Sequence, residues 1–132
     1  MPASFPTTSF KLKRTTRPGV LGAVFDLDTG PDGGPQLVEG SKELAQALEL
    51  RLLMVRGEAW EDTACGLPWF SFLGQKPPNE PLFRVELLRE LRKDLRVRQV
   101  DSIYFRYDQA RRHQYAEAYC TARDGAKVRV EV

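Results

Sequence analysis

The chain has 132 residues, 42% of them hydrophobic and 29% charged, which predicts one domain that buries its own core without disulfides or metal ions. The same balance excludes a wholly disordered chain. The formal net charge of +2 is small, and it argues against the strongly basic surface of a typical nucleic-acid-binding protein.

The charges are unevenly distributed along the chain. Residues 1–25 carry four basic and no acidic side chains, residues 26–62 carry nine acidic and three basic ones, and residues 63–132 carry thirteen basic and nine acidic ones. Separated blocks of opposite sign are typical of a subunit that binds several protein neighbours, and ordinary solvated faces produce them too.

Cys65 and Cys120 are the two cysteines, and neither their number nor their spacing indicates a disulfide scaffold or a zinc site. The N-terminus lacks the apolar core of a signal peptide, and no apolar run is long enough to cross a bilayer. We therefore expect a protein that is made and used in the cytoplasm, with no membrane partner.

The N-terminal third is predicted to be extended. Residues 1–18 combine three prolines, threonine and serine with a basic cluster, so we expect an extended basic arm there and a single domain over residues 19–132. Residues 20–27 have the composition of a strand. Glycine and proline predict a turn segment over residues 29–35, and a short extended piece follows at residues 36–38.

A first helix is predicted over residues 42–55, with a cap at Gly40-Ser41. Its apolar side chains recur at helical spacing, at Leu44, Leu48, Leu52 and Val55. The connection that follows, over residues 57–78, is too long and too aromatic for a passive loop.

Asn79 is the predicted N-cap of a second helix, with Pro81 inside its first turn. The predicted buried stripe consists of Leu82, Val85, Leu88, Leu91 and Leu95, flanked by Phe83 and Leu87. Two acid–base pairs spaced three residues apart, Glu86 with Arg89 and Glu90 with Lys93, are expected on the exposed side.

From residue 99 the apolar period changes to two, which predicts three strands. The turn around Asp124-Gly125 has two possible registers. A two-residue loop would place Ala118 and Cys120 beside Arg129 and Glu131. A three-residue loop with a left-handed Gly125 instead places Ala116, Ala118 and Cys120 on one face with Val128, Val130 and Val132. We predict the three-residue loop, because the alternative would bury charges against a helix.

The expected fold class is therefore α+β, with two main helices packed on a mostly antiparallel sheet that ends in a three-stranded C-terminal meander. The outer face of that meander would display an aromatic and basic set: Tyr104, Arg106, Tyr115, Tyr119, Lys127 and Arg129. The last strand is a candidate open edge.

Catalytic candidates are few. Glu58, Glu61 and Asp62 could form the carboxyl pair of a lysozyme-like glycosidase, but solvated loop carboxylates are the commoner outcome of such a cluster. His113 lies in a basic turn, and Cys65 has no histidine near it in sequence, so no triad is indicated. The sequence holds no phosphate-binding loop, dinucleotide motif or metal-ligand spacing, so we expect neither enzyme activity nor a cofactor.

The outer sheet face is the better functional candidate. Aromatic side chains beside Lys and Arg can stack the bases of single-stranded nucleic acid, which remains an alternative function. Tyr and Arg are also favoured at protein interfaces, and an open edge strand can accept a strand from another chain. We favour a protein partner, since the glycine-aromatic signature of the common RNA-binding sheet is missing.

The central connection carries short motifs in a recognisable order: Arg56-Gly57-Glu58, Trp60-Glu61-Asp62, Gly66-Leu67-Pro68-Trp69 and Leu73-Gly74. With the helices and strands around it, this order resembles the small baseplate wedge proteins of contractile tails, found in phages, phage-like bacteriocins and type VI secretion systems. The resemblance covers roughly residues 20–132. It implies a structural subunit; a lysozyme label in the names of some relatives does not imply activity.

The resemblance further implies a baseplate subunit that joins the wedge to the tail sheath and nucleates sheath assembly, in a six-fold particle built in the host cytoplasm. Implied partners are the sheath subunit and wedge proteins, with the tail tube or hub as a further neighbour. Implied sheath-binding residues are Tyr104, Arg106, Tyr119, Lys127 and Arg129; implied wedge-binding residues are Arg56, Glu58, Trp60, Trp69, Arg96 and Arg98. Many relatives have Glu-Pro-Arg after the second helix, where we read Arg96 to Val100 instead.

Overall fold

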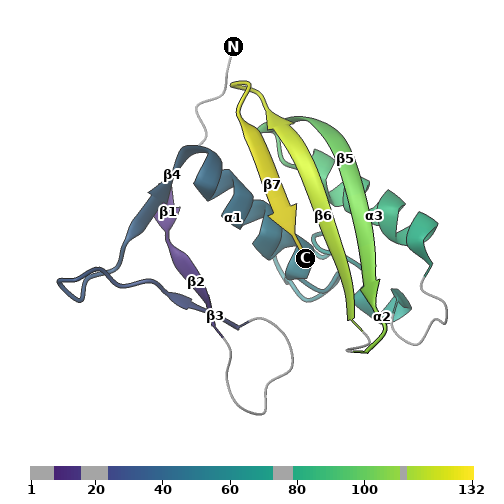
Figure 1. Cartoon of the computed structure of the whole chain (residues 1–132), viewed down its shortest axis with the longest axis horizontal. Coiled ribbons are helices and arrows are strands. Elements are labelled where there is room, and N and C mark those ends of the chain that lie inside the picture. The colour runs from purple at the N-terminus through teal and green to yellow at the C-terminus, as the bar shows by residue number, and fades with distance from the viewer. Residues whose placement is uncertain (1–7, 16–23, 73–78, 111–112) are drawn as a thin grey trace.

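The protein is represented by a computed structural model that describes residues 8–15, 24–72, 79–110 and 113–132 (Figure 1). These residues form seven strands and three helices. In chain order they are β1 (Thr8–Phe10), β2 (Leu12–Thr15), β3 (Val24–Leu27), β4 (Leu37–Glu39), α1 (Gly40–Leu53), α2 (Trp69–Phe72), α3 (Glu80–Lys93), β5 (Val97–Asp108), β6 (His113–Ala122) and β7 (Lys127–Glu131). Within these ranges no helix is long and apolar enough to span a membrane.

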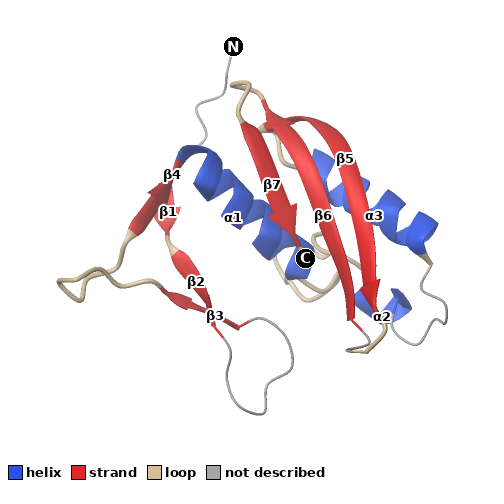
Figure 2. Cartoon of the chain, viewed as in Figure 1, coloured by secondary structure: helices blue, strands red, loops and turns tan. Residues whose placement is uncertain are grey.

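The largest sheet is the antiparallel meander β5-β6-β7. Both long helices lie on one face of this sheet, with α1 against β7 and α3 against β5 (Figure 2). The architecture confirms the predicted α+β class with two main helices on a C-terminal meander.

The core lies between these helices and the meander. Its helical side is Leu44, Leu48 and Leu52 of α1 with Phe83, Leu87 and Leu91 of α3, and its sheet side includes Ile103, Ala116, Ala118, Cys120, Val128 and Val130. The small side chains of β6 let both helices pack close to the sheet, which maximises the apolar area removed from water.

The turn between β6 and β7 follows the predicted register. Cys120 pairs with Val128, and the N–H of Ala122 donates to the carbonyl of Ala126 at 2.8 Å, which leaves a three-residue loop. Gly125 in this loop has a left-handed φ of 88°. The predicted three-residue turn is confirmed, and it places Val128 and Val130 in the core.

The start of α1 differs from the prediction. The helix begins at Gly40, its N-cap residue is Glu39, and no side chain caps it, so the predicted Gly40-Ser41 cap is wrong. The reason is that Glu39 is still paired with Thr8 in the β1-β4 ladder. Strand β4 therefore runs directly into the helix, and Gly40, with a φ of 65°, makes the corner.

At α3 the predicted cap is confirmed, because the Asn79 side chain accepts the N–H of Leu82 at 3.1 Å. The predicted buried stripe is partly wrong. Leu82, Val85 and Leu95 are 37%, 51% and 58% exposed, and Glu86 and Glu90, expected in solvent, are buried. Compared with the predicted orientation, α3 is rotated about its own axis so that Glu86 and Glu90 face the connection. There Glu86 binds Arg56 and Glu90 binds the N–H of Gly66.

Residues 8–15, placed in the predicted arm, form a ribbon with residues 24–39: β1 pairs with β4, and β2 pairs with β3. The ribbon projects from the body beside α1 (Figure 1). Gln46 of α1 binds its edge, since its Oε1 accepts the N–H of Leu12 at 2.9 Å and its Nε2 donates to the carbonyl of Phe10 at 2.8 Å. The predicted boundary at residues 18–19 and the start of the predicted strand at residue 20 lie outside the described residues.

Candidate functional site

The outer face of the β5-β6-β7 sheet carries the predicted aromatic and basic side chains. Tyr104 is 61% exposed and Tyr119 is 37% exposed. Their rings lie 5.8 Å apart in an edge-to-face arrangement, and the Arg106 guanidinium carbon lies 4.8 Å from the centroid of the Tyr115 ring. Two tyrosine rings are therefore open to a partner on this face.

Two cations of this face, Arg129 and Lys127, lie beside carboxylates. Arg129 pairs with Glu117 and, at 3.0 Å, with Glu131. Lys127 lies 3.6 Å from Asp101, which also accepts a 2.7 Å hydrogen bond from the Thr121 hydroxyl. Since the pairs neutralise one another, the face is far less positive than its Lys and Arg content suggests.

Two pKa shifts accompany these pairs. The hydrogen bond from Arg129 holds the pKa of the Glu117 carboxyl below its usual value. Hydrogen bonds from Thr121 and Gln99 do the same for the pKa of Asp101. Both carboxylates are therefore charged at neutral pH, and the network persists there.

The outer edge of β7 has unsatisfied backbone groups. Val132 exchanges both backbone hydrogen bonds with Ala116 of β6, each at 2.9 Å. Because hydrogen-bonding direction alternates along an antiparallel strand, the N–H and C=O groups of Lys127, Arg129 and Glu131 point away from β6. These groups have no hydrogen-bond partner in the described part of the chain. Strand β7 is thus ready to accept another strand.

The connection between α1 and α3 is fixed to the core. The N–H of Leu67 donates to the carbonyl of Met54 at 3.0 Å, and the N–H of Arg56 donates to the carbonyl of Leu67 at 2.9 Å. The fully buried Glu90 accepts the N–H of Gly66 at 3.0 Å. The Arg56 guanidinium pairs with Glu86 at 2.6 Å and lies 3.9 Å from Glu90. Arg56 therefore holds the connection against α3.

The two tryptophans occupy different environments. Trp69 packs its ring 5.5 Å from that of Phe83 and donates its Nε1–H to the carbonyl of Leu52 at 3.0 Å. Trp60 is 86% exposed. Trp69 is therefore part of the framework, and Trp60 is free to contact a partner.

The acidic cluster of the connection is solvent-exposed. Glu58 accepts the N–H of Val55 at 3.3 Å, and Asp62 accepts the N–H of Ala64 at 3.1 Å. Both carboxylates thus stabilise their own turns, and neither lies in the apolar pocket that keeps a catalytic carboxyl protonated.

The two cysteines lie in different environments. Burial raises the pKa of the Cys120 thiol to about 11, so it is neutral in the folded protein. Cys65 is partly exposed, and both thiols are free. Within the described ranges no group of three His, Cys, Asp or Glu side chains could hold a metal ion.

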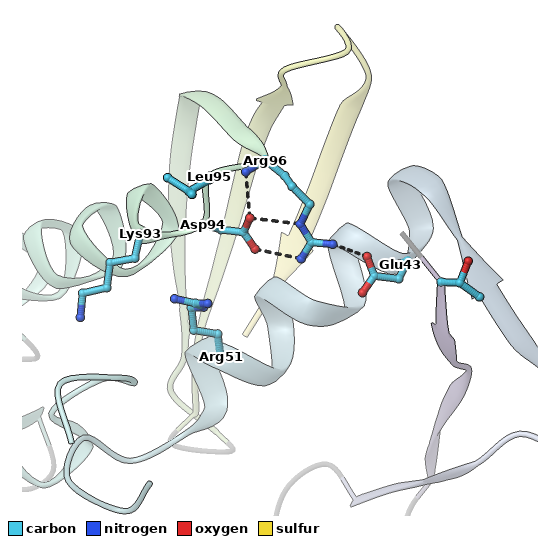
Figure 3. Close-up of a pocket in the computed structure, with 7 residues that line it drawn as sticks. Glu43, Arg51, Lys93, Asp94, Leu95 and Arg96 are labelled. Carbon is cyan, nitrogen blue, oxygen red and sulfur yellow. Dashed lines mark hydrogen bonds and ion pairs between the residues drawn. The ribbon is translucent and has the colours of Figure 1, made fainter. Parts of the chain in front are cut away.

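A charged cluster lies where α3 ends at Lys93 and β5 begins at Val97. Asp94, Leu95 and Arg96 form the whole connection, and Figure 3 shows Arg96 placed between Asp94 and Glu43 of α1. Arg96 donates from Nη2 and Nε to the Asp94 carboxylate at 2.9 and 3.1 Å, and it also pairs with Glu43. Leu95, between these charges in sequence, is 58% exposed.

The cluster borders an open pocket of about 450 Å³, lined by Thr8, Glu43, Arg51, Lys93, Asp94, Leu95 and Arg96. Burial alone would raise the pKa of Asp94, but hydrogen bonds from Arg96 hold it below its usual value. The hydrogen bond to Asp94 raises the pKa of Arg96. The ion pair is therefore fully charged at neutral pH.

The residues with implied wedge contacts fall into two groups. The side chains of Arg56, Trp69 and Arg96 form hydrogen bonds within the protein, whereas Trp60 and Arg98 are exposed. Arg98 is the extra residue of a β-bulge in β5.

The sequence analysis did not predict Glu43, Asp94 and Leu95 as site residues. The available signal was the acid-apolar-arginine order directly after a helix, which was hidden because Leu95 was assigned to the helical stripe.

No curated protein matches the chain. A family model described as contractile injection system sheath initiator matches residues 9–125, which run from β1 to the turn after β6 and end before β7. This match confirms the contractile-tail assignment that the ordered motifs of the connection predicted. The chain belongs to the sheath initiator family of contractile injection systems.

Proposed function

We propose that this sheath initiator joins the baseplate wedge to the tail sheath and nucleates sheath assembly by accepting a sheath strand at the edge of β7. Family membership gives a sheath-related structural role in a contractile particle. The observation that carries the finer proposal is the row of outward backbone groups at Lys127, Arg129 and Glu131. A strand added there would extend the meander and gain main-chain hydrogen bonds.

The outer face would supply specificity to this contact. An incoming sheath subunit would meet the exposed rings of Tyr104 and Tyr119, the paired charges of Lys127 and Arg129, and Arg106 beside the Tyr115 ring. Tyrosine and arginine are favoured at interfaces because they combine a large contact area with directional hydrogen bonds. The matched carboxylates favour a protein partner over nucleic acid, whose binding depends on unpaired cations.

For the wedge contact we propose the Asp94-Leu95-Arg96 turn together with Trp60 and Arg98. The family that the motifs resemble carries Glu-Pro-Arg after its second helix, a place that the sequence alone assigned to Arg96 to Val100. Helix α3 ends at Lys93, so the three residues that follow it are an acid, an apolar residue and an arginine. The internal pair between Asp94 and Arg96 would present Leu95 to the wedge. In this proposal Arg56, Glu58 and Trp69 act indirectly, by fixing the connection that carries Trp60.

In this proposal the protein has a structural role and catalyses no reaction. Six copies would surround the tail tube in the assembled particle.

Sheath binding can be tested with Arg129→Pro. The N–H of Arg129 points away from β6, so proline keeps the β6-β7 ladder and removes a donor only from the open edge.

Co-expression with the sheath subunit, followed by pull-down, gives the measurement. We expect Arg129→Pro to retain the circular dichroism of the parent chain and to lose sheath capture. Arg129→Ala, which removes the same side chain and keeps the donor, should capture more sheath than Arg129→Pro, and the difference between the two variants reports the backbone N–H alone. Equal sheath capture by the parent and both variants would exclude β7 as the acceptor edge.

A further inference from the structure

The meander has two outer strands, β5 and β7, and both could in principle accept a strand. The alternation of hydrogen-bonding direction along each strand shows which backbone groups of β5 point away from β6. Residues 116 and 118 of β6 face β7, so residues 115, 117 and 119 face β5 and bond to their partners Arg106, Tyr104 and Ser102. The backbone groups of Ile103, Phe105 and Tyr107 therefore point outward from β5.

A side chain occupies the middle of this second edge. Arg84 of α3 donates from Nη1 to the carbonyl of Ile103 at 3.0 Å. The guanidinium carbon of Arg84 also lies 4.9 Å from the centroid of the Phe105 ring. An incoming strand would have to displace this cation from both the carbonyl and the ring, and charged side chains placed in this way are a known protection of edge strands.

The first half of β5 is protected differently. Its register with β6 shifts between Val97 and Gln99 and again between Val100 and Ser102. Arg98 and Asp101 are the extra residues at these two bulges, which interrupt the regular spacing of outward groups that a second strand needs. The pairing of β7 with β6 is continuous from Lys127 to Glu131, and among the described residues no side chain binds the outward backbone groups of β7.

We propose that Arg84 closes β5 to strand addition and so makes β7 the single acceptor edge of the meander. The inference rests on the proposed function only for the identity of the strand that β7 accepts. As a consequence, the meander can be extended only at its β7 edge. A sheath strand can be added there, and a second copy of this chain cannot pair through β5.

The test compares two arginine deletions on the same helix in the full chain. Arg84→Ala frees the carbonyl of Ile103, whereas Arg92→Ala removes an exposed arginine with no hydrogen bond or ion pair to the rest of the described chain. Sedimentation velocity over a concentration series measures self-association. We expect Arg84→Ala to self-associate about tenfold more tightly than the parent chain, because the Ile103 carbonyl is then free to accept a hydrogen bond from a second chain. Arg92→Ala should self-associate as the parent does.

A second variant identifies the edge that is used. Adding Arg129→Pro to Arg84→Ala should leave the gained association intact, because β5 carries it. Loss of the gain in the double variant, or equal association of Arg84→Ala and Arg92→Ala, would overturn the role of Arg84. If Arg84→Ala fails to fold, Arg84→Met, which keeps an aliphatic stem against Phe105 without a donor, is held to the same two outcomes.

Sheath capture by the parent chain separates this inference from the proposed function. A parent that captures no sheath, with Arg84→Ala still gaining association through β5, refutes the function and supports the role of Arg84. A parent that captures sheath, with no change in association for Arg84→Ala, refutes the role of Arg84 alone.

Discussion

The fully buried carboxylate of Glu90 shows how one residue sets the path of a long segment. It accepts the N–H of Gly66 at 3.0 Å and pairs with Lys93, which in turn donates to the carbonyl of Ala64 at 2.6 Å. Gly66 has a φ of 97°, and a Cβ there would lie 2.4 Å from the carbonyl oxygen of Met54. Only glycine fits this approach, so the connection can pass directly beneath α3 and present Trp60 outward.

Asp94 provides a pH-dependent test at the same scale. Its folded pKa is lowered by Arg96, so its contribution to stability is complete above the unfolded value of about 3.9 and is lost as the pH falls through the folded pKa. We expect Asp94→Asn to lower the free energy of unfolding by about 2 kcal/mol at pH 7, as for a hydrogen bond to a charged group. Below pH 4 the difference from the parent should shrink.

Urea unfolding of parent and variant at several pH values measures this difference. Asp62→Asn is the matched control, because the exposed Asp62 carboxylate caps only its own turn and an asparagine oxygen can accept the same hydrogen bond. A gap between Asp94→Asn and parent that stays constant from pH 7 to pH 3 would contradict the assignment of Arg96 as the cause of the shift.

At the scale of elements, local sequence signals predicted the structure correctly where no distant contact intervened. The Gly40-Ser41 cap failed because Glu39 is still paired with Thr8. The Asp124-Gly125 turn and the Asn79 cap depend on neighbours within a few residues, and both were predictable. The rotation of α3 was not, because Glu86 and Glu90 bind Arg56 and Gly66, more than twenty positions earlier in the chain. Apolar spacing alone favoured Leu82 and Val85, which are exposed.

The same limit applies to the functional surfaces. Period-two alternation placed Tyr104 and Tyr119 on the open face, because side-chain direction in a strand follows from sequence position. The cluster of Glu43 with Asp94 and Arg96 joins residues more than fifty positions apart, so only the folded chain brings them together. The closure of β5 by Arg84 likewise needed the helix to be docked.

The N-terminal ribbon gives a prediction about a single element. A two-stranded ribbon is marginal alone, and the amide of Gln46 supplies both a donor and an acceptor to its edge. We expect Gln46→Ala to increase amide hydrogen exchange of residues 8–15 about tenfold while the melting temperature changes little, because the core is untouched.

Mass-spectrometric hydrogen exchange resolves this segment, and Lys42→Ala, an exposed change on the same helix, is its control. Unchanged exchange of residues 8–15 in Gln46→Ala would mean that the β1-β4 and β2-β3 pairings suffice to hold the ribbon.

For the whole molecule, the two proposed contacts use different sets of residues. The sheath contact uses the outer face and edge of the meander, and the wedge contact uses the turn between α3 and β5, Arg98 at the start of β5 and the exposed part of the connection. A subunit that bridges two assemblies needs such separation, since each partner can then bind without displacing the other. Substitutions at one surface should therefore spare the other.

Leu95→Asp tests this separation. Leu95 is 58% exposed, so the change leaves the core intact and places a charge where a wedge partner would bury an apolar side chain. Co-expression with the wedge and sheath proteins, followed by pull-down, should show loss of wedge capture with sheath capture retained. Leu37→Asp is the matched control, since Leu37 has the same 58% exposure but lies on the ribbon. Loss of both partners in Leu95→Asp, or wedge capture equal to that of Leu37→Asp, would show that the Asp94-Leu95-Arg96 turn is not a separate wedge contact.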